Sequence, residues 1–72
     1  MKTEFNSIFA AISAFKKIAE KTEKGISKNL KTTICDGYIY LFCSSENNEI
    51  CVELMQTGDS EFCFGFIRSF EF

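Results

Sequence analysis

The chain has 72 residues, of which 46% are hydrophobic and 15% are aromatic, and its formal net charge is −2. A chain of this length buries only about 60% of the surface that it exposes when unfolded, so we expect one domain with a thin core. The small net charge argues against a nucleic-acid mimic, and against a dedicated duplex-binding protein, which must neutralise many phosphates.

The charged residues are distributed unevenly along the chain. Six lysines and two glutamates lie between positions 16 and 31, whereas seven acidic residues and one arginine follow position 31. The lysines form a candidate basic patch: Lys16, Lys17, Lys21, Lys24, Lys28 and Lys31. This patch either makes weak, local contact with nucleic acid or simply solvates one helix face.

The N-terminal segment does not predict a signal peptide, because Glu4 and Asn6 interrupt its apolar residues. No apolar run approaches the roughly 18 residues that a membrane span requires. We therefore expect a cytoplasmic protein that does not bind a membrane.

The first third of the chain predicts a helix from about residue 4 to residue 24. With about 100° per residue, the bulky apolar side chains collect on one half of the helical circumference. They are Phe5, Ile8, Phe9, Ala11, Ile12, Phe15, Ile18 and Ala19. Thr3 suits the N-cap, and Gly25 followed by Ile26 predicts the C-terminal stop.

Three turn signals divide the remainder of the chain into strands. Asp36-Gly37 predicts a type I′ hairpin turn, Asn47-Asn48 a second turn, and Gly58-Asp59 a type II′ turn. The strands expected between them are 30–35, 38–45, 50–56 and 61–69. The predicted fold is therefore α+β, with one N-terminal amphipathic helix packed on one face of a four-stranded antiparallel β-meander.

Two-residue turns also predict the register of the strands. They pair Ile34 with Ile39, Leu41 with Leu54, and Leu54 with Cys63, which makes one face of the sheet aliphatic and the other largely aromatic. A three-residue loop at 58–60 is the alternative, and it would move the phenylalanines of the last strand to the aliphatic side. We expect the two-residue version.

One helix can cover only one face, and the bulky Phe5, Phe9 and Phe15 should prefer the aliphatic face. The aromatic face is then a candidate partner interface, since an apolar patch of this size with a charged rim is typical of protein interfaces. Its residues are Tyr38, Tyr40, Phe42, Glu53, Met55, Phe62, Phe64, Phe66 and Arg68. The expected occupant is a second copy of the chain or another protein; the alternative is that loops or the C-terminal tail fold over the face.

The C-terminal tail predicts a second mode of association. Phe70 and Phe72 should run past the start of the third strand and leave an edge that can add a strand from another chain. The alternative is a frayed terminus.

Cysteine spacing predicts neither a metal site nor a disulfide framework. The cysteines stand at 35, 43, 51 and 63 on predicted strands, no pair is two to four residues apart, and the chain has no histidine. We expect reduced, buried cysteines that fill space in the core. The four isolated glycines form no phosphate loop, so no cofactor is expected.

Together these features favour a non-enzymatic protein. Without histidine there is no ordinary acid–base group near neutral pH and no imidazole to activate a cysteine. We expect a small protein-binding module that occupies a surface of a larger macromolecule, and chain size favours an inhibitor encoded by a phage or mobile element, of the anti-defence type. The alternatives are a self-associating structural or regulatory homodimer, and a weak single-stranded nucleic-acid binder that stacks bases on the aromatic face, against which the surrounding acidic residues argue.

Overall fold

The computed structural model describes residues 4–71, and the side chains of residues 4–65. One α-helix, one short 3-10 helix and five strands follow one another along this part of the chain. In chain order they are β1 (Glu4–Phe5), α1 (Ile8–Thr22), η1 (Ile26–Asn29), β2 (Leu30–Cys35), β3 (Tyr38–Ser44), β4 (Asn48–Gln56) and β5 (Phe62–Glu71).

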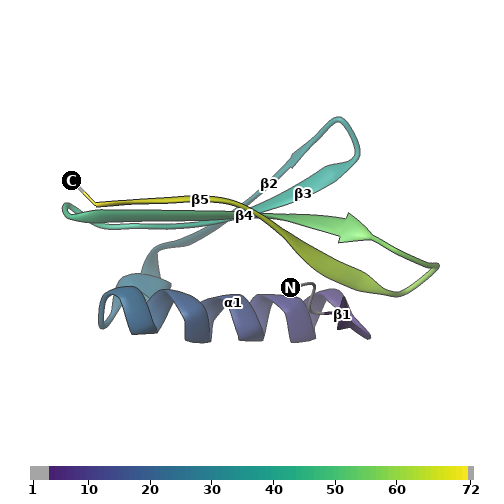
Figure 1. Ribbon diagram of the computed structural model, residues 1–72, viewed down its shortest axis with the longest axis horizontal. Helices are drawn as coiled ribbons and strands as arrows, with labels where there is room; N and C mark the ends of the chain where they lie inside the picture. The colour runs from purple at the N-terminus through teal and green to yellow at the C-terminus, as the bar shows by residue number, and fades with distance from the viewer. Residues whose placement is uncertain (1–3, 72) are drawn as a thin grey trace.

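The strands form one antiparallel sheet in the order β1-β5-β4-β3-β2, and α1 runs along one of its faces (Figure 1). The α+β class with a helix on an antiparallel sheet is confirmed. The expected number of strands is wrong, because the sheet has five and not four. Figure 1 also shows that the sheet is strongly twisted, so that the β2–β3 and β4–β5 turns point in different directions.

The extra strand arises because the helix begins later than expected. Ser7 is extended, at φ −157° and ψ 159°, and its hydroxyl oxygen accepts a hydrogen bond from the Ala10 N–H at 3.2 Å. A serine N-cap of this kind satisfies one of the free N–H groups at a helix start. The preceding Glu4 and Phe5 are released to pair with β5, opposite Cys63 and Phe62. The expected cap at Thr3 lies outside the described residues.

The helix also ends two residues earlier than expected, at Thr22. Glu23 is already extended, although its N–H still bonds to the Ala19 carbonyl at 3.1 Å. Gly25 then adopts a left-handed φ of 86°, which glycine reaches without steric cost, and starts η1. Ile26 is fully buried behind it, so Gly25 and Ile26 do mark the boundary that the sequence predicts.

The first two turns give strand pairs that retain the expected faces. Asp36 and Gly37 both have positive φ, at 52° and 83°, which is the predicted type I′ turn, and Ile34 pairs with Ile39 as expected. At the second turn the expected register is wrong by two residues, because Leu41 pairs with Val52 and not with Leu54. A shift of two leaves every side chain on its expected face.

The third turn has the longer loop, and the expected register of β5 is wrong by one residue. The Thr57 N–H donates to the Glu61 carbonyl at 2.9 Å, so residues 58–60 form the loop. Leu54 consequently pairs with Phe64 and not with Cys63. Side chains alternate between the two faces of a sheet along a strand. A register shift of one residue therefore puts each β5 side chain, up to the bulge described below, on the face opposite to the expected one.

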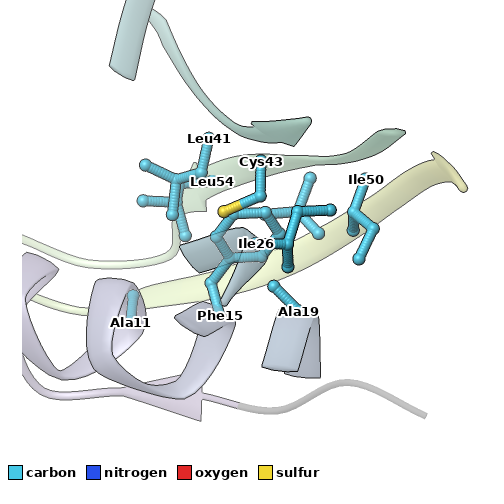
Figure 2. Packing of buried hydrophobic residues seen from close by; sticks show 9 residues of the cluster. Ala11, Phe15, Ala19, Ile26, Leu41, Cys43, Ile50 and Leu54 are labelled. Atoms are coloured by element: carbon cyan, nitrogen blue, oxygen red, sulfur yellow. The ribbon is translucent and has the colours of Figure 1, made fainter. Parts of the chain in front are cut away.

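The core lies between α1 and the sheet. Figure 2 shows the Phe15 ring pointing from the helix toward the sheet, between the small side chains of Ala11 and Ala19 that allow the helix to approach closely. The buried cluster also takes in residues of η1, β3 and β4: Ile26, Leu41, Cys43, Ile50, Val52 and Leu54. Leu41, Cys43, Ile50, Val52 and Leu54 occupy alternate positions of their strands, so they define the helix-side face of the sheet.

A candidate protein-binding surface on the outer face

The face of the sheet opposite α1 is called the outer face here. Alternation along the strands and the register assign to it Lys31, Thr33 and Cys35 of β2, Tyr38, Tyr40 and Phe42 of β3, Cys51, Glu53 and Met55 of β4, and Cys63 and Gly65 of β5. Figure 1 shows none of the described helices on this side. Five of the nine residues expected in a partner interface are therefore on the outer face: Tyr38, Tyr40, Phe42, Glu53 and Met55.

Phe62 and Phe64 were expected on the same face, and this expectation is wrong. The three-residue loop puts both residues on the helix side, where Phe64 packs against the buried cluster. Its ring centroid is 4.6 Å from that of Phe5 and 6.4 Å from that of Phe15, in an edge-on arrangement with the latter. Ring pairs of this geometry are favourable beyond the area they bury, which helps to select this register over the two-residue turn.

Three aromatic residues on β3 dominate what remains. Tyr38, Tyr40 and Phe42 follow one another at alternate positions, and Tyr38 is 48% exposed. The Tyr40 and Phe42 rings lie 6.5 Å apart and are tilted by 30°. A hydrogen bond to the Glu53 carboxylate, together with desolvation, raises the pKa of the Tyr40 hydroxyl. The hydroxyl group of this tyrosine therefore lies near Glu53 on the neighbouring strand.

Two transverse rows of residues set the charge around the rings. Thr33, Tyr40 and Glu53 form one row across β2, β3 and β4, while Lys31 and Phe42 belong to the next. A cation and a carboxylate therefore flank the rings on opposite sides. This is the apolar centre with a polar rim that protein interfaces show.

The C-terminal half of β5 pairs with β4 in a register that differs from the expected register. A bulge between Cys51 and Val52 adds one residue to β5, so that Arg68 pairs with Cys51. The side chains of Phe66, Arg68 and Phe70 lie outside those the structure describes, and so does all of Phe72. Their expected roles in an interface stay predictions.

The expected overhang of the C-terminal tail is wrong. β4 begins at Asn48, two residues earlier than expected, and Asn48 pairs with Glu71. Glu49 pairs with Phe70 in the same way. Residues 69–71 therefore extend the sheet alongside β4 and do not project beyond it.

The residues of β4 and β5 on the outer face are tightly packed. Cys51 and Cys63 are buried, and the methyl group of Met55 would lie only 3.3 Å from a Cβ added to Gly65, so the missing side chain makes room for the methionine. No pocket is found in the part of the chain that the structure describes.

The cysteines only partly follow the expectation of buried fillers. Cys43, Cys51 and Cys63 are buried, and burial is the main cause that raises the pKa of the Cys43 thiol. Cys35 is exposed, next to the type I′ turn. Among the described residues no group of three or more potential ligands comes together for a metal ion.

The six lysines of the candidate basic patch are all exposed but are not on one surface. Lys16, Lys17 and Lys21 lie on α1, and Lys24 and Lys28 follow in the loop and η1. Lys31 lies on the outer face, on the other side of the sheet from the helix. The structure thus separates one lysine from the other five.

Sequence reasoning also misplaced two helix residues and overlooked one strand residue. Ile18 was expected in the buried stripe but is 38% exposed. Phe9 was expected in the buried stripe but is 80% exposed, because it stands about 120° around the helix from Phe15. Ile34 is 73% exposed although its face is the helix side. The helix does not extend over β2. The position of the helix relative to this strand depends on tertiary packing, which no local sequence pattern shows.

Comparison with protein-family models, with curated proteins and with solved structures found no match for this chain. No helix within residues 4–71 combines the length and the apolar character needed to cross a membrane. The geometry of the outer face is therefore the basis for assigning a function.

Proposed function

We propose that this protein is a non-enzymatic protein-binding module that acts by occupying a surface of a larger macromolecule with its outer face. One observation carries the proposal. The strand register puts the column of Tyr38, Tyr40 and Phe42 on the side of the sheet away from α1, although the same chain buries Phe15 completely. Aromatic side chains of this kind supply most of the binding energy at protein interfaces when a partner covers them.

The chemistry around the rings supports a protein as the partner. Tyrosine offers an amphipathic ring with few rotatable bonds, and Met55 adapts its shape to what it meets. Lys31 and Glu53 at the rim give orientation, because each favours one sign of charge on the partner. The absence of histidine from the sequence leaves no ordinary acid–base group for catalysis near neutral pH.

The finer proposal is an inhibitor that blocks its target sterically. The outer face can cover a functional surface of a larger protein without chemistry of its own. Small inhibitors encoded by phages and mobile elements, including those that act against host defences, work in this way. We propose this class and a cytoplasmic site of action on the basis of surface type.

Differential capture from native cells tests the proposal. Tyr38→Ser and Phe42→Ser should each remove a partner that the unaltered protein retains, whereas Phe9→Ser, which changes a more exposed ring on the helix, should retain it. Truncating a residue at the centre of an interface costs at least about 2 kcal/mol, or roughly thirtyfold in affinity. Identical sets of captured proteins for all three variants would contradict the proposal.

A second candidate is the weak binding of single-stranded nucleic acid on the same rings. Phe42 pairs across the strands with Lys31, which places a cation beside a stacking surface. Affinity for a labelled single-stranded oligonucleotide should then fall steeply as salt is raised, because counterions are released from the phosphates. Binding that is insensitive to salt, or absent, eliminates this candidate.

A further inference from the structure

The strand β2 is an edge of the sheet that the rest of the described chain leaves open. It is last in the strand order, and its residues 31–35 are exposed. Ile34 is 73% exposed on the side of the sheet where α1 lies. Apart from Lys31, the strand has none of the usual protections of an edge, such as proline, a bulge or an inward-pointing charge.

The type I′ turn decides which backbone groups face outward from this edge. In a two-residue hairpin the residues that flank the turn, here Cys35 and Tyr38, form a hydrogen-bonded pair. Hydrogen-bonded and non-hydrogen-bonded pairs alternate along an antiparallel ladder. Residues at odd positions of β2 therefore bond to β3, whereas Leu30, Thr32 and Ile34 direct their N–H and C=O groups to the open edge.

We propose that β2 binds β2 of a second copy of this chain, in antiparallel orientation, so that two five-stranded sheets become one continuous sheet. The proposal is independent of the function proposed above, because it uses the edge of the sheet and not the outer face. The occupant is a second copy because the strand complements itself in side-chain type and in charge.

The alternation of inward and outward backbone groups along β2 limits the possible registers of the paired strands. Only the even-numbered residues can exchange hydrogen bonds across the open edge, so the helix-side residues of one copy face helix-side residues of the other. The register centred on Thr32 uses the whole strand: Thr32 lies opposite Thr32 of the partner subunit, and Leu30 lies opposite Ile34 of the partner subunit. Ile34, the exposed aliphatic residue of this strand, thereby gains an apolar neighbour in each copy.

Charge agrees with the same register. Lys31 lies opposite Thr33 of the partner subunit, so no two lysines directly oppose each other. Asp36, one residue beyond the C-terminal end of the strand, and Lys28 of the partner subunit, two residues before the N-terminal end and in η1, then lie at the same end of the paired strands, twice by symmetry. Both residues are exposed in the single chain.

The mass of the protein in solution, measured by light scattering over a range of concentrations, tests the proposal. The unaltered chain should be a dimer. Thr32→Pro removes the outward N–H from each copy without touching the ladder to β3, since proline is tolerated on an edge strand with its nitrogen outward. It should raise the dissociation constant of the dimer at least about tenfold. Thr32→Val retains the N–H and should leave the dimer intact.

A cross-linking variant tests the register and does not depend on how well the proline variant folds. In a Cys35→Ser background, Thr32→Cys places two thiols at the symmetry axis, within the distance that a disulfide spans, and should give a covalent dimer on mild oxidation. Lys31→Cys in the same background should not, because its partner position is Thr33 and not itself.

The outcomes separate this inference from the proposed function. A monomer at every concentration overturns the dimer, as does an unchanged dissociation constant in folded Thr32→Pro. A dimer that cross-links through Lys31→Cys and not through Thr32→Cys overturns it as well. Loss of the dimer in Tyr38→Ser places self-association on the outer face and also overturns the β2 pairing. Loss of a captured partner in Tyr38→Ser with unchanged dimer mass supports both proposals.

Discussion

Replacing one phenylalanine on each face of the sheet tests the register of the last strand most directly. Phe64→Ala removes a ring that packs on Phe5, Phe15 and the buried cluster. Phe42→Ala makes the same chemical change on the outer face, where the one described ring contact is with Tyr40 at 6.5 Å. Both side chains are half-buried, so the two variants are matched in residue type, strand environment and exposure.

The expected magnitudes differ severalfold. Truncating a core phenylalanine costs about 3–5 kcal/mol, and the partial exposure of Phe64 puts the expected loss near the lower end, at about 3 kcal/mol. Phe42→Ala should cost about 1 kcal/mol, since it leaves no cavity beneath the helix. The whole domain is expected to be stable by only about 4–11 kcal/mol, so Phe64→Ala removes a large share of its stability.

Urea unfolding followed by far-ultraviolet circular dichroism measures both losses. With a urea dependence of about 1 kcal/mol per molar, the midpoint should fall by about 3 M for Phe64→Ala and by about 1 M for Phe42→Ala. Equal shifts, or a larger shift for Phe42→Ala, would refute the three-residue loop and return Phe64 to the outer face.

Three other predictions concern polar groups. Glu23→Ala should lower the free energy of unfolding by about 1–3 kcal/mol, because the Glu23 carboxylate accepts a hydrogen bond from the buried Asn48 amide at 2.8 Å. A double-mutant cycle measured by urea unfolding checks this. Additive losses for Glu23→Ala and Asn48→Ala would contradict the coupling. The Glu20 carboxylate accepts the backbone N–H groups of Gly25 and Ser27, each at 3.0 Å, and these bonds lower its pKa below the ordinary 4.5. A lowered folded-state pKa contributes stability above about pH 4.5, and this stability is lost as the pH falls through the folded-state pKa. The difference in unfolding free energy between the unaltered protein and Glu20→Gln should therefore shrink on acidification. A difference that does not depend on pH would refute this prediction. In the native protein one thiol, that of Cys35, should react rapidly with a thiol reagent and the others only on unfolding; two or more fast thiols, or no loss of the fast phase in Cys35→Ser, would contradict the burial pattern.

The elements that the sequence predicts well are those with a strong local signal. The helix body around Phe15 follows from its period, and the Asp36-Gly37 turn follows from the need for two positive φ angles, so β2 is predicted with its bounds unchanged. The boundaries that were missed depend on single polar side chains. Ser7 starts the helix, and the Ser45 hydroxyl accepts the Asn47 and Asn48 N–H groups, which moves the second turn by one position.

The wrong placement of Phe62 and Phe64 on the outer face has a different cause. At Gly58 and Asp59 a two-residue and a three-residue loop are both compatible with the local residues, and a slip of one residue exchanges the faces. The choice is made by contacts far away in the sequence, where Phe64 meets Phe5 and Phe15. Since Phe5 belongs to a two-residue strand without any periodicity, no local pattern could have predicted that meeting.

The pairing of β1 with β5 has a consequence for the order in which the molecule assembles. Glu4 meets Cys63, so nearly the entire polypeptide lies between two neighbouring backbones. Closing so large a loop costs entropy that only previously formed structure can offset, which makes this the slow, late step of folding. During synthesis β1 emerges long before β5, and until this partner strand appears the Phe5 ring is a hydrophobic group in water that a chaperone or a neighbouring nascent chain can bind.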